Sequence, residues 1–249
     1  MTILFQPQKY NMRIHAVHKL YQQRLSRSTR PFLARGGRIA RCTKCMLLPY
    51  LCICSIKKTV ATNSAFLLLM YDDEILKPSN TGRLIADLIP DTFAFIWSRT
   101  QPEQQMLALL NDPQWQPIVI FPEEYAPPER VMRTYQMTEN AKRPLFILLD
   151  ASWAQAKKMF RKSPYLNDFP VLSFSPEAIS RYLVRKAVKD NQLATAEVAA
   201  RVLEFIGEND NADTMDLLFE TFKENYMIGK QQKQPPENAA QYLLAAKLK

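Results

Sequence analysis

Residues 145–160 read LFILLDASWAQAKKMF, and this stretch decides the fold class. Its first five residues, Leu145–Leu149, form an apolar run without polar alternation, which is typical of a strand buried on both faces of a parallel sheet. Asp150 and Ser152 interrupt the run, and a helical pattern begins near Ala151. A strand that leads directly into a helix is the unit from which parallel sheets with helical layers are built.

The same alternation of strand and helix recurs on both sides of this stretch. Four further apolar runs predict strands at Ala65–Met70, Thr92–Trp97, Pro117–Phe121 and Val171–Phe174. Helices are predicted to begin at Asn80 or Thr81, at Gln101, at Ala151, at Thr195 with Gly207 as its stop, and at Asp213 with Gly229 as its stop. We therefore expect an α/β fold with a mostly parallel sheet flanked by helices.

All four cysteines of the chain lie close together near the N-terminus, in the pattern C-x2-C followed by C-x-C. They are Cys42, Cys45, Cys52 and Cys54. Four thiolates at this spacing can converge on one tetrahedral Zn²⁺, and such a site leaves no coordination position open for a substrate. We predict a structural zinc knuckle over 41–58, because disulfides suit an oxidising compartment and no iron–sulfur motif is present.

The formal net charge is +9, and the basic residues are distributed unevenly. Residues 1–58 contain many Lys and Arg residues but no Asp or Glu. Such a block attracts polyanions through counterion release, which predicts a basic arm over 1–40 that binds nucleic acid. A solvated tail and binding to anionic lipid are the alternatives. Its aromatic residues could stack on bases or anchor the arm to its own domain: Tyr10, Tyr21 and Phe32. Basic residues near the cysteines extend the predicted RNA contact: Arg38, Arg41, Lys44, Lys57 and Lys58.

The hydropathy pattern indicates a cytoplasmic protein. No apolar run reaches the roughly 18 residues that a membrane span requires, and the first thirty residues lack the apolar core of a signal peptide. We expect no membrane association and find no sign of an obligatory protein partner. The 249 residues are enough for one large core with a small appendage.

Polar residues directly after the predicted strands are the first candidates for a site, because parallel sheets bind ligands at the carboxyl ends of their strands. Three segments qualify: Asp150–Trp153, Pro122–Glu124, and Tyr71–Glu74 with the following Pro78–Arg83. Each also has a structural interpretation. Asp150, Ser152 and the Asn80-Thr81 pair fit helix caps, and Trp153 fits a core position.

The segment Asp150-Ala-Ser152-Trp153 resembles the signature of the DTW-domain family. Further landmarks follow in the family's order: the cysteine pattern, Asn80-Thr81-Gly82-Arg83-Leu84, Phe121-Pro122, Gln155-Ala156 with Met159, Pro164 with Leu166, and Thr195 with Glu197. They span residues 42 to about 200. The sequence departs from the pattern in two places. Ser152 replaces the threonine of the signature but keeps its hydroxyl, and Tyr71-Asp72 stands where many members have His-Pro. The resemblance therefore assigns no role to Tyr71 and leaves that of Glu74 open.

The resemblance implies a tRNA-uridine aminocarboxypropyltransferase of the SPOUT-related TDD superfamily. Its core would be SPOUT-like and knotted and would bind S-adenosyl-L-methionine (SAM). The 3-amino-3-carboxypropyl group of SAM would pass to N3 of a loop uridine in tRNA, with release of 5'-methylthioadenosine. The domains would be the arm (1–40), the zinc knuckle (41–58), the DTW α/β catalytic domain (59–229), and a linker with a C-terminal helix (230–249).

The resemblance also implies site residues. Those expected around SAM are Asn80, Thr81, Gly82, Phe121, Pro122, Leu149, Ser152, Trp153, Thr195 and Glu197. Asp150 is the expected proton acceptor, with a helix cap or a partner of the SAM amine as its other roles, because both histidines of the chain, His15 and His18, lie in the basic arm. Trp153 would stack on a base or wall the pocket. Further phosphate contacts would come from Arg181, Arg185, Lys186 and Lys189.

Two other functions fit the sequence. A SAM-dependent RNA methyltransferase would use the same pocket with the methyl group aligned for transfer. A zinc-knuckle RNA-binding protein without catalysis would explain the charge and the cysteines, but not the polar clusters after three strands. Ribosomal RNA is an alternative substrate.

Overall fold

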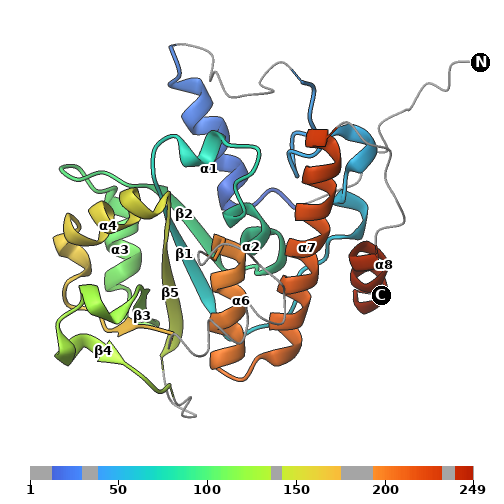
Figure 1. Cartoon of the computed structure of the whole chain (residues 1–249). Coiled ribbons are helices and arrows are strands. Elements are labelled where there is room, and N and C mark those ends of the chain that lie inside the picture. The colour runs from blue at the N-terminus through green and yellow to red at the C-terminus, as the bar shows by residue number, and fades with distance from the viewer. Residues whose placement is uncertain (1–12, 30–38, 136–141, 175–192, 232–238, 249) are drawn as a thin grey trace, which may run out of the picture.

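The protein is described by a computed structural model that places residues 13–29, 39–135, 142–174, 193–231 and 239–248. Across these ranges the centre is a six-stranded, fully parallel sheet in the order β2-β1-β5-β3-β6-β4 (Figure 1). The strands are β1 (Ala65–Met70), β2 (Thr92–Ile96), β3 (Trp115–Ile120), β4 (Val131–Met132), β5 (Arg143–Asp150) and β6 (Val171–Leu172). The predicted α/β class with a parallel sheet is confirmed.

Both faces of the sheet are covered, which explains why the central strand β1 is apolar along its whole length. In β1, alternate residues enter two different hydrophobic clusters, one with Phe66, Leu68 and Met70 and the other with Ala65, Leu67 and Leu69. Successive strand residues point to opposite faces, so a strand covered on both sides requires an unbroken apolar run.

Helices form a layer on each face of the sheet (Figure 1). One face is covered by α1 (Ala16–Ser26), α2 (Gly82–Leu88), α6 (Thr195–Phe205) and α7 (Asn209–Gln231), and the other by α3 (Gln104–Asn111) and α4 (Trp153–Arg161). The last helix, α8 (Ala239–Lys247), packs against α7. The arrangement has three layers, with the sheet in the middle.

The five predicted strands are confirmed, with ends shifted by at most two residues. The sequence did not predict β4, because two residues are too few to show a periodic pattern. The helices after Asn80, Ala151 and Thr195 are present as α2, α4 and α6. Two other starts were displaced: α3 begins three residues after the predicted Gln101, and α7 begins four residues before Asp213.

The two glycines predicted to end helices behave differently. Gly207 follows α6 with φ 86°, in the left-handed region that favours glycine, so it ends that helix as predicted. The prediction for Gly229 is wrong, because α7 continues to Gln231. A Cβ atom at Gly229 would lie 3.1 Å from Cδ1 of Leu48 and 3.3 Å from Cδ1 of Leu51, so a glycine here lets α7 pack closely on the knuckle.

The N-terminal segments share the main core. Val17 and Leu20 of α1 are buried in the same hydrophobic cluster as the knuckle residues Leu47 and Ile53 and the α2 side of the sheet. Tyr21 packs against this cluster too. The described part of the basic arm is therefore an anchored helix, and the predicted domain boundaries stay predictions.

Several expectations fall on residues outside the described ranges. These are most of the basic arm (1–12 and 30–38, with Tyr10, Phe32 and Arg38) and the segment 175–192, which holds Arg181, Arg185, Lys186 and Lys189. The knotted threading implied by the resemblance also depends on the path through 175–192, so it stays a prediction.

Every helix among the described residues is too short or too polar to span a lipid bilayer.

Candidate functional site

Asp150 is the last residue of β5 and lies at the carboxyl edge of the sheet, opposite Met70 of β1. The backbone amide of Tyr71 donates to the Asp150 carbonyl oxygen at 3.0 Å, so both strands end together. The residue is only 2% exposed. The sheet thus brings a buried carboxylate to the edge where parallel sheets bind ligands.

Two hydrogen bonds hold the Asp150 carboxylate. Asn80 Nδ2 donates to Oδ2 at 2.7 Å, and Thr195 Oγ1 donates to Oδ1 at 2.7 Å. Asn80 precedes α2 and Thr195 begins α6, so one carboxylate ties two helix starts to the end of β5. A buried charge requires such partners, because its hydration has been lost.

The start of α2 lies against the same carboxylate. A Cβ atom at Gly82 would overlap Oδ2 of Asp150, so only glycine leaves room for the carboxylate. Thr81 Oγ1 accepts a hydrogen bond from the Ala196 amide at 3.3 Å, which joins α2 to α6 a second time. Asn80 Oδ1 is buried and has no hydrogen-bond partner among the described residues. Asn80 Oδ1 can therefore accept a hydrogen bond from an amine or hydroxyl group of a ligand.

Burial raises the pKa of the Asp150 carboxyl to about 6, because the charged form has lost its water. The hydrogen bonds from Asn80 and Thr195 act in the opposite direction, Glu74 raises the pKa further, and Arg83 lowers it. A carboxylate with this pKa accepts a proton near neutral pH more readily than an exposed aspartate does.

Arg83 supports the loop that presents Asn80, although no role was predicted for it. Its fully buried guanidinium donates from Nε to the Asn80 carbonyl oxygen at 3.1 Å and from Nη2 to the Lys77 carbonyl oxygen at 3.2 Å. A buried guanidinium needs several acceptors, and the two carbonyl oxygens supply them. The sequence gives no signal for this role, because only the structure shows that Arg83 is buried.

An aromatic cluster lies on the other side of the β5–α4 junction. Trp153 stacks on Phe121 with ring centroids 5.6 Å apart, and Phe121 stacks on Phe160 at 4.4 Å. Tyr125 meets Phe121 and Trp153 edge to face, at 5.5 and 5.8 Å. Phe121 and Trp153, both expected around SAM, therefore lie against each other, while Tyr125 and Phe160 were not predicted. The buried Phe121 and Phe160 hold the partly exposed Trp153 and Tyr125 in place.

Other predicted SAM-site residues act as caps or border the aromatic cluster. Ser152 is the N-cap of α4, and its amide and hydroxyl both donate to Gln155 Oε1, at 3.0 and 2.7 Å. Glu197 accepts from the Ala194 amide at 2.8 Å and so caps α6. Leu149 is half-buried and packs against the hydrophobic cluster that includes Phe121 and Phe160, and Pro122 caps the 3₁₀ turn Glu123–Tyr125.

Two residues in the segment that follows β1 also lie near Asp150. The Tyr71 ring stacks on Trp97 at 5.8 Å, and Glu74 Oε2 accepts from Lys77 Nζ at 2.6 Å. Glu74 is close enough to Asp150 for its charge to raise the Asp150 pKa. The segment that departs from the family pattern thus borders the site.

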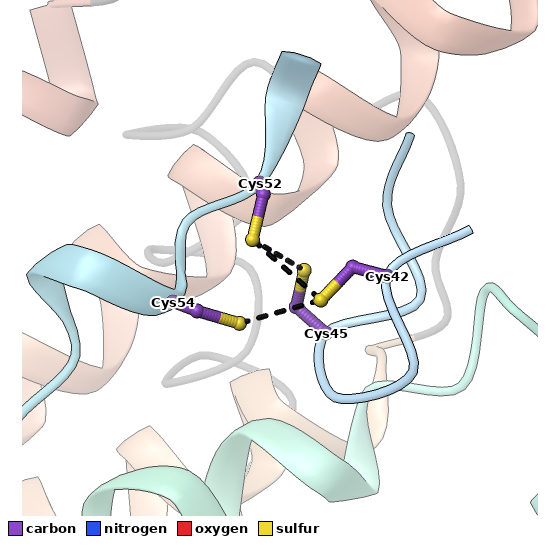
Figure 2. Close-up of side chains that lie close together, drawn as sticks. All are labelled: Cys42, Cys45, Cys52 and Cys54. Atoms are coloured by element: carbon purple, nitrogen blue, oxygen red, sulfur yellow. Dashed lines mark hydrogen bonds between the residues drawn. The ribbon is translucent and has the colours of Figure 1, made fainter. Parts of the chain in front are cut away.

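The four cysteine sulfurs point toward one another at the N-terminal end of the fold (Figure 2). Cys42 Sγ lies 3.6 Å from the Sγ atoms of both Cys52 and Cys54, and Cys45 Sγ lies 3.7 Å from Cys52 Sγ. A disulfide requires about 2.05 Å. A tetrahedron with Zn–S bonds of about 2.3 Å has edges of roughly 3.8 Å. The geometry therefore fits a metal ion and excludes disulfides.

The local backbone forms a tight turn around the first cysteine pair. The Met46 amide donates to the Cys42 carbonyl oxygen at 2.9 Å, and the Cys42 amide donates to the Leu47 carbonyl oxygen at 2.8 Å. Met46 has φ 62°, which is rare for a residue with a side chain. Hydrogen bonds among the thiols lower the pKa of Cys42, with Cys45 as the first partner, and those to Cys42 raise the pKa of Cys45 and Cys54.

A buried polar chain joins the two halves of the knuckle. His18 Nε2 lies 3.2 Å from the Lys44 carbonyl oxygen, and the His18 amide faces His15 Nδ1 at 3.4 Å. His15 Nε2 lies 3.2 Å from Asp87 Oδ1, and Lys57 Nζ lies 2.5 Å from Asp87 Oδ2. Lys44 lies next to Cys45, and Lys57 follows Cys54 in the sequence. His18 of α1 therefore supports the first cysteine pair, and Asp87 of α2 supports the second. The proposed RNA contact by Lys57 is wrong, because its side chain is 3% exposed.

The ionisation of this chain follows from its partners. Burial alone would raise the pKa of Asp87, but the Lys57 ammonium and the hydrogen bond from His15 lower it to about 2. Burial opposes the charge on Lys57, whereas Asp87, Cys45 and Cys54 raise its pKa. Lys57 is therefore a buried cation between a carboxylate and the thiolates.

His15, His18 and Asp87 are also close enough to one another to hold a metal ion. However, the two imidazole rings are stacked, with centroids 3.6 Å apart and planes 19° apart. A metal ion must lie in the plane of each coordinating ring, and Lys57 already neutralises Asp87. These contacts favour a structural ion-pair network over a second metal site.

Comparison with known families agrees with this geometry. The sequence model of the DTW domain matches residues 39–227, which is most of the chain. The chain belongs to the DTW domain family. Membership is consistent with a function in tRNA modification. No solved structure matches the chain.

The DTW match includes both the cysteine cluster and the sheet. Within it, the family landmarks come together in space although they are far apart in sequence. Asn80 and Gly82, Asp150, and Thr195 meet at one carboxylate, and Phe121 meets Trp153 beside it. The DTW signature thus occupies the junction of a polar and an aromatic cluster.

Proposed function

We propose that this DTW protein is a SAM-dependent tRNA-uridine aminocarboxypropyltransferase. The observation that carries the proposal is the convergence of the family landmarks on Asp150, at the carboxyl edge of a parallel sheet. Ligands of open α/β sheets bind at this edge. The adjoining aromatic cluster supplies a surface on which an adenine or uracil ring can stack.

The reaction links uridine N3 to the carbon next to the sulfonium of SAM. The new N3–Cγ bond forms as the S–Cγ bond breaks. The electron pair of the broken S–Cγ bond stays on sulfur, which gives neutral 5'-methylthioadenosine. The N3 proton passes to a base. The protein selects this carbon over the methyl group by placing it at attack distance from N3, because positioning supplies much of the rate.

We assign the proton acceptor role to Asp150. Its raised pKa, about 6, suits a base at neutral pH. Its two hydrogen bonds leave one lone pair free on each oxygen. In the alternative role, the same carboxylate holds the SAM amine. Asn80 Oδ1, which has no partner among the described residues, is the second acceptor for that amine.

The cysteine cluster is assigned to structural Zn²⁺. Four thiolates prefer a tetrahedral soft-to-borderline cation, and the sulfur separations fit it. A site with four protein ligands leaves no position for substrate, so its contribution is to hold the knuckle against α7 and α2. The chemistry belongs to the Asp150 cluster.

The RNA substrate is proposed to be tRNA. Uridine N3 takes part in Watson–Crick pairing, so the target must be an unpaired loop nucleotide. The basic character of the chain, +9 overall, supports a polyanionic partner. We further propose that the protein acts in the cytoplasm.

The test is incubation of purified protein with unmodified tRNA and SAM, followed by mass spectrometry of the nucleosides and of the adenosine by-product. Aminocarboxypropyluridine together with methylthioadenosine is the expected result. Methylated nucleoside with S-adenosylhomocysteine would show a methyltransferase. Bound tRNA without any product, and no thermal shift with SAM, would leave a zinc-knuckle RNA-binding protein.

Asp150→Asn separates the two roles of the carboxylate. If Asp150 is the base, the variant keeps its SAM affinity but loses turnover, and the acidic limb of the pH profile disappears. If it binds the amine, SAM affinity falls first. Transfer that persists at the wild-type rate with SAM binding intact would rule out the base assignment.

A further inference from the structure

The solvent-facing side of α4 carries a row of cations that begins at an aromatic ring. Trp153, Lys157 and Arg161 are spaced four residues apart, so their side chains lie along one face of the helix. Lys158 and Lys162 flank this row, and both are exposed. The helix contains no acidic residue, and its opposite face is buried through Ala156, Met159 and Phe160.

The aromatic ring at the start of this row is rigidly supported and yet accessible. Trp153 is 38% exposed, although it stacks on Phe121 and meets Tyr125 edge to face. Phe121 is itself sandwiched against Phe160. The folded core holds the indole ring in place and leaves part of it exposed to solvent. A base can therefore stack on the ring with little loss of side-chain entropy.

The cations lie where they would meet a strand that passes over the ring. Lys157 Nζ is 5.7 Å from the centroid of Trp153, and Lys158 Nζ is 5.8 Å from the centroid of Trp97. From Trp153 to Arg161 the helix axis extends about 12 Å. The 3₁₀ turn whose Tyr125 meets Trp153 carries the acidic residues Glu123 and Glu124, and Glu123 pairs with Arg133. The charge distribution favours a polyanion along α4.

We propose that this face of α4 binds the unpaired RNA strand next to the target nucleotide, with a base on Trp153 and phosphates at Lys157 and Arg161. Aromatic stacking combined with a positive track is how proteins hold single-stranded nucleic acids. The choice of RNA as the partner rests on the proposed function. The row begins three residues after Asp150, so a strand bound here delivers its next nucleotide to the carboxylate edge.

Other anionic partners fit this face less well. A membrane-binding helix inserts several large apolar side chains. On the exposed face of α4, by contrast, Trp153 is the single large apolar side chain, and its neighbours along the row are cations. An acidic peptide would match the charges but would leave the flat exposed indole without a specific partner. Single-stranded RNA provides both a planar base and a phosphate chain.

The experiment measures binding of fluorescently labelled, unmodified tRNA to the full-length protein without SAM, over a range of salt concentrations. Lys157→Gln with Arg161→Gln removes two cations from α4. The control, Lys223→Gln with Lys230→Gln, removes the same charge from α7. We expect the α4 pair to weaken binding by tenfold or more and to lower the salt slope by about 2. The α7 pair should leave both quantities close to wild type.

Trp153 is tested by two substitutions. Trp153→Leu removes the stacking surface and should weaken tRNA binding by about 5- to 150-fold. Trp153→Phe should restore most of the affinity. Quenching of tryptophan fluorescence by tRNA should be present in the wild type and reduced in Trp153→Phe, which a purely structural role would not produce. Unchanged thermal midpoints show that the variants fold.

The outcomes separate this inference from the proposed function. If the wild type transfers the aminocarboxypropyl group but the α4 variants bind tRNA normally, the α4 surface is wrong and the function stands. The same conclusion follows if Trp153→Leu impairs SAM binding alone, since the indole then walls the SAM site. If the wild type is inactive in transfer but the α4 variants lose tRNA binding, the surface stands without that function.

Discussion

Gly82 lies so close to the Asp150 carboxylate that a Cβ atom at position 82 would overlap Oδ2. This contact explains why a glycine stands at the first position of α2, where its helix propensity is poor. The glycine lets the carboxylate receive Asn80 and Thr195 from two different helix starts. The geometry of the site therefore depends on the lack of a side chain at position 82 as well as on the polar groups that bind the carboxylate.

Gly82→Ala should disrupt the site. The added methyl group must displace the Asp150 carboxylate, at a cost of about 1–3 kcal/mol, and it separates Asp150 from Asn80 and Thr195. We expect the stabilisation of the protein by SAM, measured as a thermal shift, to fall sharply. Gly207→Ala is the control, because it strains a left-handed residue after α6 without touching Asp150. Equal SAM responses in both variants would contradict the assigned position of the ligand.

The raised pKa of Asp150 makes stability depend on pH. The native carboxyl has a pKa of about 6 against an ordinary value of 3.8, so the folded state binds more protons between these values. The contribution of Asp150 is favourable at low pH and is lost as pH rises through about 6. Relative to Asp150→Asn, the wild type should lose up to about 3 kcal/mol of unfolding free energy between pH 4 and 7.5.

Denaturant titrations at several pH values check this dependence. Asp213→Asn, on the exposed side of α7, controls for the loss of a carboxylate elsewhere. A constant difference between wild type and Asp150→Asn across the pH range would show that the native carboxyl titrates like an unfolded one.

The sequence predicted the sheet well because its central strands are buried on both faces. A short, unbroken apolar run between turn residues, such as Ala65–Met70, predicts a strand buried on both faces, and β1 has these bounds. The end of α7 could not be predicted in this way. Gly229 looks like a helix stop in sequence, and only its contact with Leu48 and Leu51 of the knuckle explains it.

The site was predicted in part for a similar reason. Asp150 and Asn80 follow apolar runs, so their position at the carboxyl edge follows from the topology of a parallel sheet. Arg83 and Tyr125 could not be found, because the burial of Arg83 and the contact of Tyr125 with Trp153 depend on how the chain packs in three dimensions. Lys57 was misinterpreted, since a lysine beside a cysteine cluster gives no sign in sequence of the buried Asp87 that it pairs with.

Metal removal should affect the whole domain. Cys45 and Cys54 are buried in the same hydrophobic cluster as α2, α6 and α7, so the knuckle cannot loosen without exposing that core. We expect chelation to lower the midpoint of a single unfolding transition, not to melt a separate module. Elemental analysis should find one zinc per chain, lost in Cys54→Ser and retained in Ser55→Ala. A separate low-temperature transition after chelation would show that the knuckle folds independently.

The Lys57–Asp87 pair should be strongly coupled, because both side chains are almost completely buried. Lys57→Met leaves the Asp87 carboxylate with His15 as its partner and should cost about 3–5 kcal/mol of unfolding free energy. Asp87→Asn leaves the ammonium uncompensated and should be similarly damaging. The double variant removes both charges, so we expect it to be less destabilised than the sum of the single changes by at least about 1 kcal/mol.

Lys19→Met, on the exposed side of α1, serves as the control for loss of a lysine. Additive losses in the double variant would show that the two charges do not stabilise each other. Because Lys57 also faces the thiolates, its loss should change the rate at which a chelator extracts the metal, whereas Lys19→Met should leave that rate unchanged.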